Sequence, residues 1–271
     1  MSVPKLKFRS MTLDENIDVI KWAYYEDNGL LSVRDFTIQY FEELGQLDEN
    51  APKEKVYQLI ERVVKKDYYK YEERIKKEVI RYNNLWQKYN DIYFEVLSDY
   101  LSISWPSNLE VIEGKVGLIP VFPRYLDSFS FSVATGMDEL KLIETCAHET
   151  LHFLWFEKWK SIHPETPRRE YDAPYIAWQY SEMVTDPILN NKPFSDIVEF
   201  RERGYNSFYE IYDNQTLVMD NLRNLFAEDI EINEKINNGF DYVKEILDYK
   251  EKKAKYCLLY TSDAADDRIS V

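Results

Sequence analysis

Apolar residues recur with the period of a helix along most of this chain. The spacing between Leu13 and Asp27 predicts an amphipathic helix that ends at the turn Asn28-Gly29, and a second short helix is expected over Val33–Leu44. From Pro52 to Pro106 the helical period continues without an intervening Gly or Pro. This stretch predicts either one very long helix or two helices joined near Asn83 and Asn84.

The pattern changes between Leu109 and Gly136, where β-branched and aromatic residues alternate with polar ones. Three short strands are expected there, at Leu109–Ile112, Val116–Phe122 and Phe129–Val133. The helical period returns for Leu140–Ile162 and Tyr175–Leu189, and two or three more helices are expected to finish the chain. A mostly helical order with one cluster of strands predicts an α+β fold that is predominantly helical.

The charge balance restricts the classes of partner. The chain of 271 residues carries 49 Asp and Glu against 34 Lys and Arg, a formal net charge of −15 at pH 7. This charge repels nucleic acid and anionic membrane surfaces, and no basic patch free of interleaved acids is evident, so neither is expected as a partner. The 45% hydrophobic content is sufficient for a buried core. The pattern carries no signal for an oligomeric state.

Three features favour a cytoplasmic protein. The first ten residues contain no apolar stretch of signal-peptide length, and no later segment approaches the length of a membrane span. The two cysteines, Cys146 and Cys257, are too few for a disulfide framework or a cysteine-ligated zinc site. A reducing compartment is therefore the simple expectation.

The last residues have an unusual sequence. Residues 257–267 read CLLYTSDAADD, which resembles the in-frame translation of a sequencing-library adaptor. On this interpretation residues 257–271 are a non-native tail, and Cys257 is not a native residue. The chain is then expected to comprise a helical N-terminal region over 1–106, a catalytic region with C-terminal helices over 107–256, and this tail.

One short segment has the pattern of a metal site. His148, Glu149 and His152 form the motif H-E-x-x-H inside a long run without Gly or Pro. Residues four apart on a helix lie about 40° apart around its axis, so both imidazoles point to one side and can bind a single tetrahedral ion. Glu149 lies one step round the helix and can activate water without being a ligand. Cys146 lies about 200° round from His148 and is expected to be structural.

The alternative is an ordinary amphipathic helix in which two histidines fall four apart by chance. Against it, imidazoles on a buried helix are costly unless they have partners. A catalytic zinc site also needs a third protein ligand. The only other histidine is His163, and Glu157 faces away from His148 on the same helix. The better candidate is Glu182, whose apolar neighbours argue against the alternative of a solvated helix charge; these neighbours are Trp178, Tyr180, Met183 and Val184.

HETLH followed by SEMVTD resembles the glutamate zincins, the thermolysin-like superfamily of zinc metallopeptidases, whose second helix carries E-x-x-x-D. The resemblance implies that Zn2+ is held by His148, His152 and Glu182, and that Glu149 is the catalytic base. It implies that Asp186 accepts a hydrogen bond from the distal N–H of His148, which would orient the ring. It also implies a zincin-like core in which a small mixed sheet packs on the active-site helix.

The resemblance extends from the strands before Gly136 to Asp186, and the helical N-terminal half matches no zincin pattern. In zincins the strand before the active-site helix is an edge strand that pairs with an extended substrate, and Phe129–Val133 stands at that place. A merely structural strand is the alternative. Candidates for the residue that polarises the carbonyl oxygen are His163, Tyr205 and Tyr242.

The function expected from these observations is that of a zinc-dependent metallopeptidase, a hydrolase acting on a peptide or protein substrate. Two alternatives stay open. One is a catalytically silent interaction protein that keeps a zincin fold and binds a partner through its acidic helical N-terminal region. The other is a metallohydrolase that acts on a non-peptide substrate, because a fold does not determine the substrate.

Overall fold

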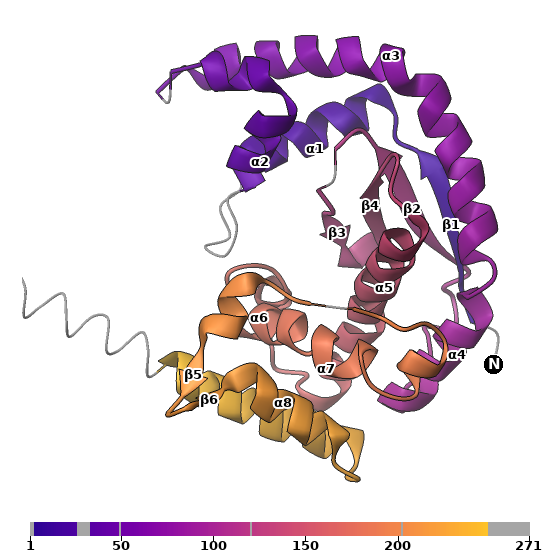
Figure 1. Ribbon diagram of the computed structural model, residues 1–271, viewed down its shortest axis with the longest axis vertical. Helices are drawn as coiled ribbons and strands as arrows, with labels where there is room; N and C mark the ends of the chain where they lie inside the picture. The colour runs from indigo at the N-terminus through magenta and orange to yellow at the C-terminus, as the bar shows by residue number, and fades with distance from the viewer. Residues whose placement is uncertain (1–2, 26–32, 49, 120, 202, 249–271) are drawn as a thin grey trace, which may run out of the picture.

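The computed structural model describes residues 3–25, 33–48, 50–119, 121–201 and 203–248 (Figure 1). The protein is predominantly helical, with a four-stranded sheet and a small two-stranded sheet, and the expected α+β class is confirmed. The expected turn at Asn28-Gly29 and the tail over 257–271 lie outside the described residues. Among those that are described, no helix combines the length and the apolar character that crossing a bilayer requires.

The four-stranded sheet has the strand order β1-β2-β4-β3. β1 (Lys5–Ser10), β2 (Val111–Gly117) and β4 (Ser130–Ala134) are parallel, whereas β3 (Arg124–Tyr125) runs antiparallel on the outer side of β4. The expectation that residues 129–133 form an edge strand is therefore wrong, because β3 covers that side. A strand of two residues shows no alternating period, so the sequence pattern did not indicate it.

β1 is a strand that the helical period of the chain does not predict. Its Leu6 and Phe8 are buried while Lys5 and Lys7 are exposed, which is the alternation of a half-buried strand. β1 pairs with β2, so the sheet extends across the expected boundary at residue 106. β2 runs without interruption through Gly114, where two strands were expected. A Cβ on Gly114 would clash with the ring of Phe8, so glycine leaves room for this side chain on the sheet.

The outer edge of β1 is covered by side chains from two helices. α3 (Lys53–Trp86) and α4 (Asn90–Leu101) follow this edge and are separated near the predicted junction (Figure 1). Asn83 Oδ1 accepts from the backbone N of Phe8 at 2.9 Å, and Asn83 Nδ2 donates to Phe8 O at 3.0 Å. Asn90 Oδ1 accepts from Leu6 N at 2.9 Å. These amides occupy backbone groups that a further strand would otherwise use.

A capping box begins α1 (Leu13–Tyr25) directly after β1. Glu15 N donates to Thr12 Oγ1 at 3.1 Å, and Thr12 N donates to Glu15 Oε2 at 2.9 Å. The Glu15 carboxylate also accepts from Arg9 with 2.6 Å to each oxygen, and Arg9 contacts Glu113 of β2 at 2.9 Å. These contacts hold the reversal of the chain from β1 into α1. α2 (Val33–Tyr40) follows and is shorter than expected, because the chain continues as a 3-10 helix.

α5 (Glu139–Ile162) confirms the expected helix and runs through the centre of the protein (Figure 1). The turn that leads into it from β4 contains Gly136, with a φ of 81°. A Cβ at this position would lie 2.2 Å from Nη2 of Arg74 in α3. The Asp138 side chain then caps the helix by accepting from Lys141 N at 2.8 Å. The start of α5 is thus held by a left-handed glycine and an N-cap in succession.

Two buried tyrosines connect α5 to the N-terminal helices. Tyr82 of α3 donates its hydroxyl to Ala134 O at 2.7 Å and accepts from Met137 N at 3.0 Å, so it bridges the turn between β4 and α5. Tyr93 of α4 donates to Ala147 O at 2.7 Å, in the residue before His148. The helical N-terminal region therefore supports the helix that carries the H-E-x-x-H motif.

The expected helix over residues 175–189 is divided in two. α6 (Ile176–Met183) and α7 (Thr185–Leu189) are separated at Val184. Pro187 has no N–H to donate to Met183 O, so the helical hydrogen bonding is interrupted there. α8 (Val218–Ala227) and a helix over 232–248 complete the chain on this side of the protein, in agreement with the helices expected at its end (Figure 1).

We expect Tyr82→Phe to lower the free energy of unfolding by about 1–3 kcal/mol, because two backbone groups at the start of α5 lose a buried partner. Tyr69→Phe on the same helix is the control, since Tyr69 is 60% exposed and its loss should change stability by less than about 0.5 kcal/mol. Urea unfolding measures both. Equal effects of the two substitutions would show that the Tyr82 hydroxyl does not support the turn.

The ion pair between Arg9 and Glu15 should make the stability of the folded protein depend on pH. The hydrogen bonds from Arg9 lower the pKa of Glu15 to about 2, from an ordinary value near 4.5. The ionised carboxylate therefore stabilises the folded state fully above about pH 4.5, and this contribution is lost as the pH falls toward 2. Glu15→Gln keeps an acceptor for the capping box but removes the charge. The difference in unfolding free energy between the wild type and this variant should shrink below pH 4.5, and a constant difference from pH 7 to 3 would contradict it.

Candidate metal centre

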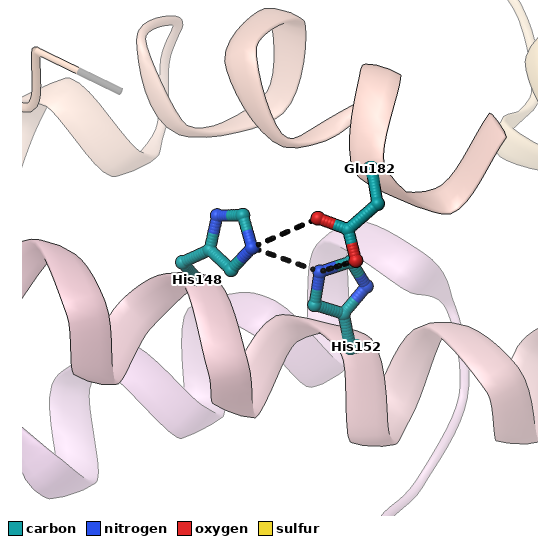
Figure 2. Close-up of side chains that lie close together, drawn as sticks. All are labelled: His148, His152 and Glu182. Carbon is teal, nitrogen blue, oxygen red and sulfur yellow. Dashed lines mark hydrogen bonds and ion pairs between the residues drawn. The ribbon is translucent and has the colours of Figure 1, made fainter. Parts of the chain in front are cut away.

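Three predicted site residues meet between α5 and α6 (Figure 2). The Nε2 atoms of His148 and His152 lie 3.1 Å apart. Glu182 places Oε2 at 3.3 Å from His148 Nε2 and Oε1 at 3.4 Å from His152 Nε2. The side chains of His152 and Glu182 are 0% and 6% exposed, and that of His148 is 17% exposed. The structure thus places the three residues together, as the sequence spacing predicted.

These separations suit a small tetrahedral cation. Zinc bonds to imidazole nitrogen and carboxylate oxygen are about 2.0–2.1 Å long, so ligand atoms on a tetrahedron lie about 3.3 Å apart. The distance of 3.1 Å between the two nitrogens is close to that value, as are the distances of 3.3 Å from His148 to Oε2 of Glu182 and 3.4 Å from His152 to Oε1. Two imidazoles and one carboxylate are also a donor set of catalytic zinc sites, in which a fourth position stays open. The residues therefore fit a zinc ion.

Aromatic packing holds the two helices at this separation. Trp155 of α5 and Tyr180 of α6 make an edge-to-face contact with ring centroids 5.6 Å apart, and both rings are fully buried. On the other side of α5, Phe153 packs against Phe129 and Phe131 at 5.5 and 6.4 Å, next to β4. α5 is thus held between the sheet and α6, and His152 faces α6.

Burial and neighbouring groups set the protonation of the centre. Burial, helped by the positive charge of Arg124, lowers the pKa of His152 to about 3, so its ring is neutral and able to bind a metal. Burial works against ionisation of Glu182, but the two histidines and Arg124 hold its pKa well below the usual range. For Glu149 burial is the stronger effect and raises the pKa, while Arg124 partly offsets the rise.

Arg124 is a site residue that the sequence patterns did not reveal. It lies on β3, and its Nη1 donates to Glu149 Oε2 at 3.1 Å while its Nη2 donates to Glu182 Oε1 at 3.3 Å. The Arg124 side chain is 10% exposed. Two buried acids in one site require positive charge nearby, and this is the signal that could have prompted a search for an arginine. The sequence alone does not identify this arginine, because its position depends on the order of the strands in the sheet.

Asp186 has different partners from the predicted one. Its Oδ2 accepts from Tyr209 and from Arg223, each at 2.6 Å, and its Oδ1 accepts from Asn190 at 2.8 Å. Among the described residues, these donors and not His148 hold the Asp186 carboxylate. The break between α6 and α7 explains the difference, because Glu182 and Asp186 no longer share one regular helical face. Asp186 instead ties α7 to α8.

The remaining candidates lie in other surroundings. Cys146 is completely buried, as expected of a structural residue, and burial raises the pKa of its thiol. His163 packs on Trp159 with ring centroids 4.4 Å apart, and Tyr205 packs on Trp178 of α6 at 5.8 Å. Tyr242 accepts from Asn221 at 2.7 Å and donates to Asp213 at 3.2 Å. None of these contacts is with a residue of the metal centre.

Comparisons with protein-family models, with curated proteins and with solved structures found no match to this chain.

Asp186→Asn should reduce the free energy of unfolding by about 1–3 kcal/mol, because a buried carboxylate that serves three donors is lost. Zinc affinity should be unchanged, whereas a bond from Asp186 to a ligand histidine would make the affinity fall about 10- to 100-fold. Asp220→Asn is a matched control, since Asp220 pairs with the same Arg223 at 2.8 Å but its side chain is 46% exposed. Urea unfolding and zinc titration of both variants measure the two effects.

Proposed function

We propose that this protein is a zinc-dependent metallopeptidase in which His148, His152 and Glu182 hold the metal ion and Glu149 is the general base. The observation that supports the proposal is that three ligand-type side chains lie at the separations of a tetrahedral site, next to the buried carboxylate of Glu149. Glu149 lies on α5, as the two histidines do. A zinc ion bound there would act as a Lewis acid and lower the pKa of water to about 7.

Glu149 has the properties required of a general base. Its side chain is 8% exposed, and burial raises its pKa above the ordinary carboxylate value. A base of this kind can accept a proton from water and return it to the amine that leaves when a peptide bond is cleaved. Arg124 holds Oε2 of Glu149 at 3.1 Å, which orients the carboxylate.

The arrangement of the sheet supports a peptide as substrate. Asn83 and Asn90 occupy the backbone groups on the outer side of β1, whereas β3 lies at the opposite edge of the sheet. β3 also supplies Arg124 to the metal centre, so this edge lies beside the site. An extended peptide can add to such an edge through backbone hydrogen bonds, and we infer that the substrate chain pairs with β3.

The compartment is inferred from cysteine chemistry. Cys146 is a buried free thiol, and unpaired cysteines suit a reducing environment. We therefore propose that the protein acts in the cytoplasm.

The Glu149→Gln and Glu182→Gln variants should lose activity for different reasons. Glu149→Gln removes the proton acceptor and leaves the three ligands, so zinc content should stay near normal while peptide cleavage is lost. Glu182→Gln removes an anionic ligand, so zinc affinity itself should fall, and activity should partly return with excess zinc. Elemental analysis combined with cleavage of a peptide library measures both. Glu157→Gln, on the same helix and outside the cluster, is the control and should behave as the wild type.

The outcomes separate the proposal from its alternatives. A wild-type protein that binds no zinc and cleaves no peptide would overturn the proposal. Zinc binding without cleavage of any peptide would instead favour a silent interaction protein or a hydrolase with a non-peptide substrate. A Glu149→Gln variant with full activity would show that Glu149 is not the base.

A further inference from the structure

The guanidinium of Arg124 bridges two carboxylates that come from different helices. It lies 3.1 Å from Glu149 of α5 and 3.3 Å from Glu182 of α6, while Arg124 itself belongs to β3. All three side chains are at most 10% exposed. The bridge therefore joins the proposed base to a proposed metal ligand in the interior of the protein.

The contacts of Arg124 differ from those of a dedicated ion pair. Arg9, for comparison, holds the Glu15 carboxylate through two nitrogens at 2.6 Å each, and its contact with Glu113 is also short, at 2.9 Å. Arg124 instead offers one nitrogen to each of two acids, at distances longer than the 2.7–2.9 Å typical of charge-assisted hydrogen bonds. Its position is that of a cation shared between two anions. The charge is permanent, because a guanidinium does not lose its proton in proteins.

We propose that Arg124 is a resident counter-cation, which cancels one of the two negative charges of the metal-free site and whose contribution a bound metal ion takes over. The proposal rests on the proposed function, since it concerns the same three ligands. Arg124 is then a positioning residue, because it keeps the side chains of Glu149 and Glu182 in the interior before the metal binds. Its charge also lowers the affinity of the site for the metal.

A count of charges gives the direction of the effect. With neutral imidazoles, Glu149 and Glu182 leave the metal-free site with two negative charges, which Arg124 reduces to one. A divalent ion cancels the two negative charges by itself, so in the metal-bound site Arg124 adds a positive charge that has no counterpart. Buried charge without compensation is strongly unfavourable. Arg124 should therefore stabilise the metal-free protein more than the metal-bound protein, and this difference lowers the affinity for metal.

The test compares Arg124→Met with the wild type, in the presence of a chelator and in the presence of zinc. We expect the melting temperature of the metal-free variant to fall by several degrees and that of the zinc-bound variant to fall less. The zinc dissociation constant, measured by competition with a chromophoric chelator, should become smaller by about tenfold or more. Arg124→Lys keeps the charge and should stay near the wild type in both measurements.

Arg168→Met is the matched control. Arg168 also bridges two carboxylates, those of Asp127 and Asp172 at 3.0 and 2.8 Å, but its side chain is 40% exposed. Its loss should lower both melting temperatures slightly and equally, and should leave zinc affinity unchanged.

A double variant keeps the test decisive if Arg124→Met does not fold without metal. Arg124→Met combined with Glu149→Gln carries the same charge in the metal-free site as the wild type, so its metal-free melting temperature should recover most of the loss. Failure to recover would overturn the counter-cation role. Unchanged or weaker zinc binding by Arg124→Met would also overturn it while leaving the proposed function intact, whereas a wild type that binds no zinc would overturn both.

Discussion

Two carboxylates, those of Glu149 and Glu182, lie in the interior of this protein within reach of one guanidinium, and the cost of burying them governs the surrounding structure. Such charges are tolerated only with compensation in the same place. Three elements that are distant in sequence must therefore meet: α5 carries one acid, α6 carries the other, and β3 supplies the cation. A strand of two residues is in this way as necessary to the centre as the helices are.

The N-terminal region has a structural part in this arrangement. α5 is held through Tyr82, which bonds the turn before it, and through Tyr93, which bonds the backbone beside His148. β1 extends the sheet on the side of β2, and Asn83 and Asn90 occupy its outer edge. The N-terminal region, which matches no zincin pattern, thus supports the helix that carries the motif.

The sequence was informative where a local rule applied. α5 and the pairing of His148 with His152 follow from helical spacing alone, and Glu182 could be found because it is a charge among apolar neighbours. β1 could have been found from its alternating residues. β3 and Arg124 could not, because their position depends on which strands are neighbours in the sheet. The contacts of Asp186 with Tyr209, Arg223 and Asn190 could not be read from helical spacing, because α6 and α7 are separated at Val184.

The turn between β4 and α5 fixes the number of residues between the start of α5 and the metal centre. Gly136 has a φ of 81°, which other residues rarely adopt, and Asp138 caps the helix, so the start of α5 lies at a fixed number of residues before His148. Each residue adds about 100° of rotation and 1.5 Å of rise. A single insertion between Asp138 and His148 would swing both imidazoles away from Glu182 and separate Trp155 from its partner. An insertion or deletion in this segment should therefore disrupt the site as much as a substitution of either histidine. A change of length in the loop beyond Ile162 does not rotate the histidines.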